Sequence, residues 1–318
     1  MQRFRVSEDS MRPTLLPGDE FVATGSRPAV VGDIVALPHP GRPDFWLVKR
    51  LRAGPGGRVD GRALGPGEAW VTSDNPGVET TDSSSFGPVP MTSLKPMVAR
   101  LDETTFLEAV SLLTDEEPPF ATVIEEHGPP PFWQRPAGFA TLVWLIMEQQ
   151  VSLESGAAMY RRLHGLLGEI TPETVAGSSE RELRGIGVTR QKTSYLLELA
   201  RSIVAGELDM GALEKDTFQE ARRSLLAVKG IGPWTADAYL LSALRFPDVF
   251  PVGDRALQVG TAEVLGLTSV PGKDELEMLS RPWRPVRAAA ARVVWHAYLK
   301  RRGRVEPTDP TVSGLSAD

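Results

Sequence analysis

The feature that most constrains the fold of this 318-residue chain is a change in hydrophobic period near residue 100. Before that point, apolar residues alternate within short segments bounded by Gly, Pro, Asn or Asp: EFVATG, DIVALPHP, FWLVKRLRA, GRVDGRAL and EAWVTSDN. After it, the apolar residues recur with helical spacing. Two periods in one chain predict two domains, a small all-β domain over 1–100 and an all-α domain over 101–318.

The helical spacing begins after an acidic, proline-rich passage, TDEEPPFATVIEEHGPPPFWQRP. It then runs through six segments: FATLVWLIMEQQVSLESGAAMYRRLHGLLG, TRQKTSYLLELARSIVAG, FQEARRSLLAV, TADAYLLSALRF, RALQVGTAEVLG and VRAAAARVVWHAYLKRRG. The last strand-like segment, SLKPMVARL, belongs with the first domain. We therefore expect the domain boundary between Leu94 and Glu103.

Composition excludes several kinds of site. The chain has no cysteine, which rules out disulfides, thiolate zinc sites, cysteine nucleophiles and cysteine-ligated iron–sulfur clusters. Its four histidines are scattered, without the i,i+3 or i,i+4 spacing that pairs metal ligands on a helix. No apolar run is long enough to span a bilayer, and the first residues lack the apolar core of a signal peptide. We expect a cytoplasmic protein with no membrane association.

Charge leaves nucleic-acid binding open. A net charge of −6 argues against nonspecific coating of nucleic acid but allows a small local patch. One basic cluster, Lys300, Arg301, Arg302 and Arg304, ends an apolar helical pattern. It is explained equally well by a charge that complements the helix dipole or by phosphate contact.

The most informative segment is LLAVKGIGPWTADAYLL, in which Gly230-Ile231-Gly232 joins two helical patterns and Pro233 starts the second. Such a turn directs backbone N–H groups outward at a helix N-terminus, an arrangement that can hold a phosphate without reading sequence. By itself a GIG turn is weak evidence, because LRGIGVTRQKTSYLL contains a similar turn that can be a simple helix connection.

An aspartate follows the hairpin at a short distance. In PVGDRALQVG, Asp254 comes directly before a helical run. Taken locally, it is most simply a helix N-cap. The alternative is a catalytic carboxylate beside the hairpin.

Taken together, GIGPWTADAYLL and PVGDRAL resemble the hairpin and catalytic aspartate of helix-hairpin-helix DNA glycosylases. LIMEQQVSLESGAAMYRRL resembles the QQ(V/I)S helix of that superfamily, and RPWRPVRAAAARVVWHAYL its C-terminal helix. The branch most similar is 3-methyladenine DNA glycosylase II. The resemblance covers about residues 120–302 and implies an enzyme of base excision repair, with double-stranded DNA containing alkylated bases as its partner.

The resemblance also implies the chemistry and the residues. Trp234 stands where bifunctional members carry a lysine, so it implies a monofunctional enzyme that leaves an abasic site. An N-alkylated purine is a cationic leaving group, and Asp254 would stabilise the oxocarbenium-like sugar. No cofactor is implied beyond a monovalent cation at the hairpin. The implied DNA contacts are listed by role: phosphate at Gly230, Ile231, Gly232 and Thr235; base pocket at Trp234, Trp283, Trp144 and Tyr239; wedge into the duplex at Gln150 and Val151.

The strand-like domain carries a second possible site. Ser10 opens SMRPTLLPGD, and VKRLRA and FGPVP follow in the order typical of signal-peptidase-like S24/S26 serine peptidases, the nickel superoxide dismutase maturation type in particular. This resemblance implies that Ser10 is a nucleophile and Lys49 its general base, which requires a desolvated amine. The chain departs from the pattern at Ser73 and Ser84, where the family has Gly and Arg.

Three hypotheses follow. The first is a DNA glycosylase with an appended peptidase-like domain, whose partner would be a protein substrate. The second is a soluble Ser/Lys protease with a DNA-binding helical module in which Asp254 is inert. The third is an incidental fusion of two independent halves. The combination of hairpin, Asp254, QQVS and PWR favours the first.

Overall fold

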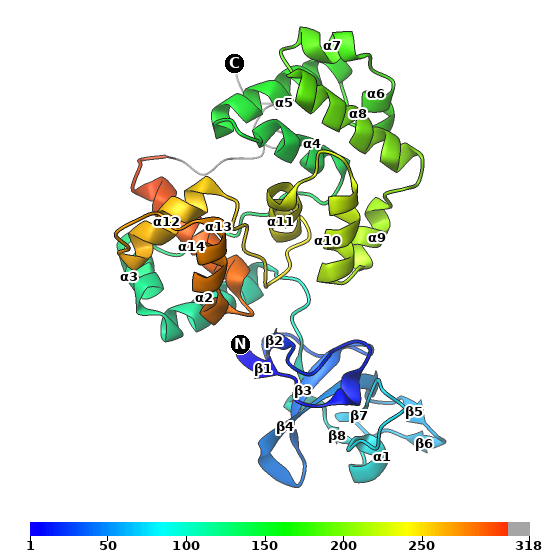
Figure 1. The fold of residues 1–318 in the computed structure, drawn as a ribbon. Coiled ribbons are helices and arrows are strands. Elements are labelled where there is room, and N and C mark those ends of the chain that lie inside the picture. The colour runs from blue at the N-terminus through cyan, green and yellow to red at the C-terminus, as the bar shows by residue number, and fades with distance from the viewer. Residues whose placement is uncertain (305–318) are drawn as a thin grey trace. The chain divides into compact units, whose positions relative to one another are not determined.

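A computed structural model describes residues 1–304 of the chain, which form two compact units (Figure 1). The first unit comprises Met1–Glu116 with Trp283–Val286, and the second comprises Glu117–Pro282 and the described residues after Val286. The predicted layout of a strand-rich region followed by a helical region is confirmed. The boundary at residue 100 stays a prediction, since the units group segments by contact.

The first unit is built on a five-stranded antiparallel sheet with the order β8-β7-β4-β3-β9. In that order, its strands are Val89–Pro90, Glu68–Thr72, Arg42–Ala53, Ile34–His39 and Lys95–Pro96. Two further ribbons pair β1 (Gln2–Arg5) with β2 (Glu20–Ala23) and β5 (Arg58–Val59) with β6 (Arg62–Ala63). Alternate residues of β3, β4 and β7 form the core of the sheet, among them Val35, Leu37, Leu47, Leu51 and Val71.

The expectation that this region is all-β is wrong. Within residues 1–100 it also contains α1 (Ser83–Phe86) and the 3-10 turns η1 (Asp9–Met11) and η2 (Met91–Ser93). The first unit further includes α2 (Glu103–Glu116), which lies in the range predicted to be helical. Helix α1 is a polar SSSF segment that forms because Asp82 and Ser85 make a reciprocal capping box. Helix α2 is tied to the end of β2 through Thr24, whose hydroxyl donates to Glu108 at 2.6 Å. The alternation of apolar residues in the sequence predicts neither the capping box nor the bond between Thr24 and Glu108.

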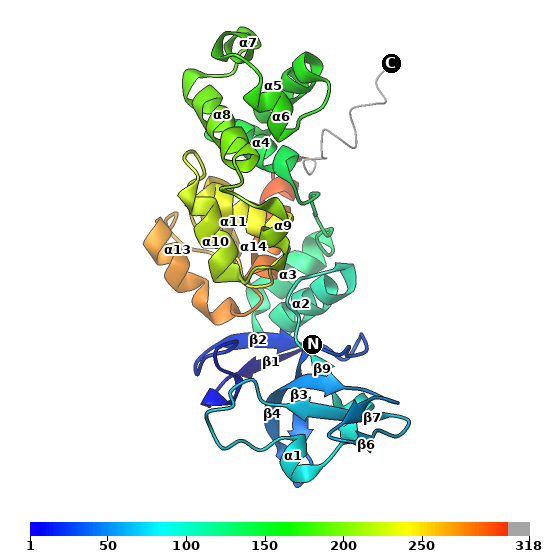
Figure 2. The ribbon, with the colours of Figure 1, turned by 90° about the vertical axis from the view of Figure 1, so that its right-hand side faces the viewer.

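The second unit is helical throughout (Figures 1 and 2). Its helices are α3 (Pro118–His127), α4 (Phe139–Glu148), α5 (Leu153–Leu167), α6 (Pro172–Ala176), α7 (Glu180–Gly185), α8 (Arg190–Val204), α9 (Met210–Lys215), α10 (Phe218–Ala227), α11 (Pro233–Ser242), α12 (Arg255–Leu265), α13 (Lys273–Leu279) and α14 (Arg287–Lys300). Helix α4 packs on α5, α8 and α11, and α12 packs on α14 and α3. None of the described helices combines the length and apolar character needed to cross a membrane.

Two local features differ from the sequence-based expectation. The segment 139–168 is two helices, because the chain leaves α4 at Gln149, Gln150 adopts a positive φ of 57°, and Ser152 caps α5. The proline-rich passage before it contains α3, which starts at Pro118. Proline is compatible with the first turn of a helix, so its presence does not break this one.

The hairpin between α10 and α11 depends on one glycine. Gly230 has a φ of +98°, and a Cβ at this position would lie 2.3 Å from Cγ of Tyr195 in α8. Gly232 differs: it has a φ of −86°, and the space around its missing side chain is open. The turn therefore requires glycine at 230 for both conformation and space, but not at 232.

The two glycines give a matched pair of variants. Gly230→Ala should destabilise the helical unit by about 1–3 kcal/mol from backbone strain, with the contact to Tyr195 adding to it. Gly232→Ala should leave the midpoint of thermal unfolding nearly unchanged. Calorimetry of the three proteins checks this, and equal midpoints for the two variants would contradict the described turn.

Candidate active site

A large cavity of about 1350 Å³ opens in the helical unit. It is lined by the turn after α4, the hairpin between α10 and α11, the start of α12 and one face of α14. The site residues that reach it are Trp144, Gln150, Val151, Gly230, Ile231, Gly232, Trp234, Thr235 and Asp254. Segments more than a hundred residues apart in sequence thus meet around one space.

Asp254 is held by three hydrogen bonds. It is the N-cap of α12, and its Oδ1 accepts from the backbone N–H of Leu257 at 2.9 Å. The same oxygen accepts from the indole N–H of Trp295 at 3.1 Å, and Oδ2 accepts from the indole N–H of Trp234 at 2.8 Å. The N-cap interpretation is therefore correct, and it coexists with a partly buried carboxylate that faces the cavity.

The hairpin is connected to the turn after α4. The side-chain amide of Gln149 donates to the carbonyl oxygen of Gly230 at 3.0 Å and to the hydroxyl of Thr235 at 2.9 Å. Thr235 is 1% exposed, and the N–H of Ile231 already donates to Val228 within the turn. Of the four predicted phosphate contacts, Gly230 and Gly232 keep the most accessible backbone.

Gln150 and Val151 lie on the rim of the same cavity. Both are exposed, Val151 by 42%, and the left-handed conformation of Gln150 turns the chain outward there. Left-handed backbone at a residue other than glycine costs energy and is found at functional turns. The position of these residues agrees with a wedge, and that role stays a prediction.

The structure places two of the four predicted base-pocket aromatics, Trp234 and Trp144, in the cavity lining. Trp234 lines the cavity but holds Asp254 through its N–H. Trp144 is 2% exposed, and the guanidinium of Arg135 lies 3.7 Å from its ring centre. Tyr239 and Trp283 are buried and do not belong to the described cavity lining.

Tyr239 instead anchors the chain in front of α4. Its hydroxyl accepts a hydrogen bond from the backbone N–H of Gly138 at 2.9 Å. Burial raises the pKa of Tyr239 to about 12, so the phenol stays protonated at neutral pH.

Several cavity residues were not found from the sequence: Trp133, Arg135, Glu148, Gln149, Lys192 and Trp295. Arg135 pairs with both oxygens of Glu148, at 3.1 and 3.0 Å, and this pair is largely buried. Lys192 donates to the carbonyl oxygen of Met147 at 2.6 Å, and burial lowers the pKa of Lys192. The only signal for Gln149 was its place in QQVS, and Trp295 was hidden in an apolar helical pattern.

The first unit brings Ser10 and Lys49 together. The Nζ of Lys49 donates to Oγ of Ser10 at 3.0 Å. Lys49 lies on the same inward face of β4 as Leu47 and Leu51, and it is 3% exposed. Burial lowers the pKa of Lys49, while the charges of Asp82 and Glu8 oppose that shift. A desolvated amine beside a hydroxyl is the arrangement of a Ser/Lys dyad.

The two departures from the peptidase pattern both contact Asp82. The backbone N–H of Ser73 donates to its Oδ2 at 3.0 Å, and the hydroxyl of Ser84 donates to its Oδ1 at 2.6 Å. These bonds lower the pKa of Asp82 against the effect of its burial, which keeps the carboxylate charged near Lys49. The segment that carries Ser10 is held by Asp74 and Asn75, whose backbone N–H groups donate to the Ser10 carbonyl.

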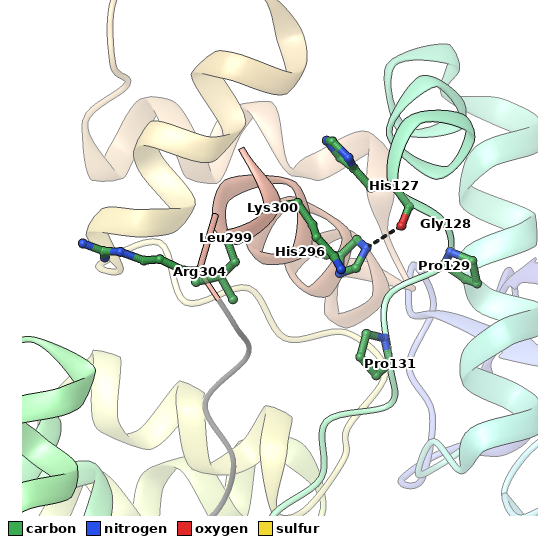
Figure 3. A pocket seen from close by; sticks show the side chains of 8 residues that line it. All are labelled: His127, Gly128, Pro129, Pro131, His296, Leu299, Lys300 and Arg304. Atoms are coloured by element: carbon green, nitrogen blue, oxygen red, sulfur yellow. Dashed lines mark hydrogen bonds between the residues drawn. The ribbon is translucent and has the colours of Figure 1, made fainter. Parts of the chain in front are cut away.

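A second cavity of about 420 Å³ lies beside α14 and the end of α3 (Figure 3). His127, His296, Lys300 and Arg304 line it, and His296 Nε2 lies 3.2 Å from the carbonyl oxygen of His127. In the basic cluster, Arg302 pairs with Glu263 at 2.6 Å and Arg301 lies near the same carboxylate. Among the described residues, no group of three His, Asp or Glu side chains is arranged to hold a metal ion.

Family models match both parts of the chain. Residues 143–285 match the HhH-GPD superfamily of base excision DNA repair proteins, and residues 1–65 match signal peptidase, peptidase S26. These matches confirm the two resemblances seen in the sequence. The first spans the QQVS turn, the hairpin and Asp254, and the second spans Ser10 and Lys49.

Individual proteins match the helical part. A DNA-3-methyladenine glycosylase of Bacillus subtilis is 30% identical over 169 residues, which is 49% of this chain and 56% of that protein. The crystal structure of a DNA-3-methyladenine glycosidase from Bacillus halodurans is 30% identical, with a TM-score of 0.53, and covers 61% of this chain and 91% of that one.

A 3-methyladenine DNA glycosylase of Schizosaccharomyces pombe, solved in complex with abasic DNA, shares the fold at 22% identity and a TM-score of 0.54. It covers 59% of this chain and 95% of that one. The chain spans 56% and 64% of the first two curated relatives it matches. Over residues 143–285, the chain therefore belongs to the HhH-GPD superfamily of base excision DNA repair proteins.

Proposed function

We propose that the helical unit is a DNA glycosylase that removes N-alkylated purines of the 3-methyladenine type from double-stranded DNA. The observation that carries the proposal is Asp254, a carboxylate fixed by three donors in a cavity that also contains the hairpin. The names of the similar proteins from Bacillus support the same activity.

The reaction needs few groups. A cationic alkylpurine leaves with the electron pair of its glycosidic bond, and positive charge develops on the sugar. Asp254 stabilises that charge, and water then adds to the sugar and leaves an abasic site. Trp234 occupies the position at which a lysine nucleophile would stand, and its N–H is used by Asp254. The enzyme is therefore monofunctional and does not cleave the strand.

Two elements of the helical unit contact DNA in this proposal, the hairpin before α11 and the turn after α4. The backbone of Gly230 and Gly232 at the start of α11 suits one phosphate. Gln150 and Val151, exposed on the rim, fill the space left by the flipped base. Gln149 joins both elements through its two hydrogen bonds, so that the wedge and the phosphate contact keep a fixed spacing.

Replacement of Asp254 tests the proposal. Asp254→Asn should slow the release of alkylated purine from methylated DNA by about 100- to 1000-fold, because the charge that stabilises the sugar is lost. Affinity for DNA containing a stable abasic analogue should persist. Equal release by variant and wild type would rule out the assignment.

The two tryptophans that bind Asp254 give a finer test. Trp234→Phe removes the donor to Oδ2, while Trp295→Phe removes one of two donors to Oδ1. We expect kcat to fall by about tenfold for Trp234→Phe, since a hydrogen bond to a charged group is lost, and by less for Trp295→Phe. KM should change little in either. A larger effect at Trp295 would contradict this account.

A second activity is favoured by one observation, the 3.0 Å contact between Lys49 Nζ and Ser10 Oγ. We infer that the first unit is a Ser/Lys hydrolase that acts on a protein substrate. Lys49, desolvated on the core side of β4, would take the proton of Ser10 as the hydroxyl attacks a peptide carbonyl.

The pH dependence of Ser10 reactivity tests this inference. Only neutral Lys49 can accept the proton, and burial lowers its pKa below the ordinary value of 10.5. Labelling of Ser10 by a fluorophosphonate should therefore rise with pH and level off below pH 10.5. Lys49→Met should abolish the rise, and Ser10→Ala should abolish labelling. A pH profile that is unchanged in Lys49→Met would exclude the dyad.

A further inference from the structure

The chain between α3 and α4 forms a wall of the main cavity. This segment, residues 128–138 with the sequence GPPPFWQRPAG, is called the strap here. Three bonds fix it to α4 and α11: Arg135 N–H donates to the Ser242 carbonyl at 2.9 Å, Gly138 N–H donates to the Tyr239 hydroxyl at 2.9 Å, and the Thr141 hydroxyl donates to the Pro136 carbonyl at 2.6 Å. Its prolines restrict it further. The strap is therefore a rigid surface and not a loose loop.

The strap presents Trp133, Gln134 and Arg135 to the cavity. Arg135 covers the ring of Trp144 and pairs with Glu148, so Trp144 has little surface left for a ligand. Trp234 and Trp295 both donate to Asp254, so in the proposed reaction they lie beside the sugar that this carboxylate stabilises. Trp133 is the one of these four tryptophans that combines two properties. It is partly exposed, unlike Trp144, and its indole N–H has no hydrogen-bond partner among the described residues, unlike those of Trp234 and Trp295.

We propose that the strap is the surface that recognises the flipped base, with Trp133 stacking on the base and the Arg135–Glu148 pair setting the charge behind it. The inference rests on the proposed glycosylase function and names its base-contacting wall. With Trp234 and Trp295 engaged at the carboxylate, the strap is a wall of the same cavity that still offers a partly exposed ring to a base.

The charges suit a cationic base. An unpaired Arg135 would repel an N-alkylated purine, but the bidentate bonds to Glu148 cancel its charge. The face of Trp133 then adds cation–π attraction, which a cationic ring gains and a neutral purine gains less. Tyr239 and Ser242 act as positioning residues, because each accepts a hydrogen bond from the backbone of the strap. Ser242 also belongs to the described cavity lining, whereas Tyr239 does not.

The test compares Trp133→Ala with Trp133→Phe, which keeps a flat ring, in the full chain. Trp70→Ala, a half-buried tryptophan of β7 in the other unit, is the matched control. Single-turnover release of 3-methyladenine and 7-methylguanine from methylated DNA is measured, together with affinity for a duplex containing a stable abasic analogue. Thermal unfolding verifies that each variant is folded.

We expect Trp133→Ala to release both bases at least about tenfold more slowly, because one base–aromatic stack is lost. Trp133→Phe should retain most of the rate, and Trp70→Ala all of it. Affinity for the abasic duplex should be unchanged in every variant, since that DNA offers no base to stack.

Two results would overturn the proposal. One is wild-type release by a folded Trp133→Ala. The other is an equal loss of abasic-duplex affinity and of release in both Trp133 variants, which would make the residue a structural or backbone contact. If the wild-type chain itself releases no alkylated purine, the glycosylase function fails, and that result is distinct from failure of the strap alone.

Discussion

Asp254 accepts hydrogen bonds from donors on three helices, and this convergence organises the helical unit. Leu257 fixes it at the start of α12, Trp234 reaches it from α11, and Trp295 reaches it from α14. A carboxylate in a protein interior needs such donors to offset its lost hydration. The bonds that stabilise the charge therefore also determine how the three helices meet, and they orient the same charge toward the cavity.

The cavity lining contains charged side chains that differ in how they are paired. Asp254 is a fixed negative charge in its lining, and two other carboxylates of the lining are paired with arginines, Glu148 with Arg135 and Asp237 with Arg222. Pairing matters because unpaired charges in a partly buried space act over longer distances than in water. Asp254 differs from these two carboxylates, because its three described hydrogen bonds come from neutral N–H donors and not from an arginine.

The sequence predicted the parts of the site that depend on local rules. The hairpin needs Gly230, the N-cap needs Asp254, and the dyad needs an inward lysine on an apolar strand, and each leaves a local pattern. Trp133 and Arg135 could not be found this way, because their place depends on bonds from α11 that form only on folding. Trp144 and Tyr239 were predicted to belong to the base pocket, but no sequence pattern tells that Arg135 covers the ring of Trp144 or that Tyr239 is buried away from the cavity. Helix α1 was missed because its capping involves polar residues alone.

Lys49 has a thermodynamic consequence for the first unit. Its pKa is lowered by burial in the folded chain and returns to its ordinary value on unfolding. The unfolded state then binds more protons between those two values, so this residue makes unfolding progressively easier as the pH falls through that window. Below the lowered pKa the full penalty of a buried ammonium is present. The same desolvation that would make Ser10 reactive thus reduces the resistance of its own domain to acid, and the surrounding core of Leu47 and Leu51 must compensate.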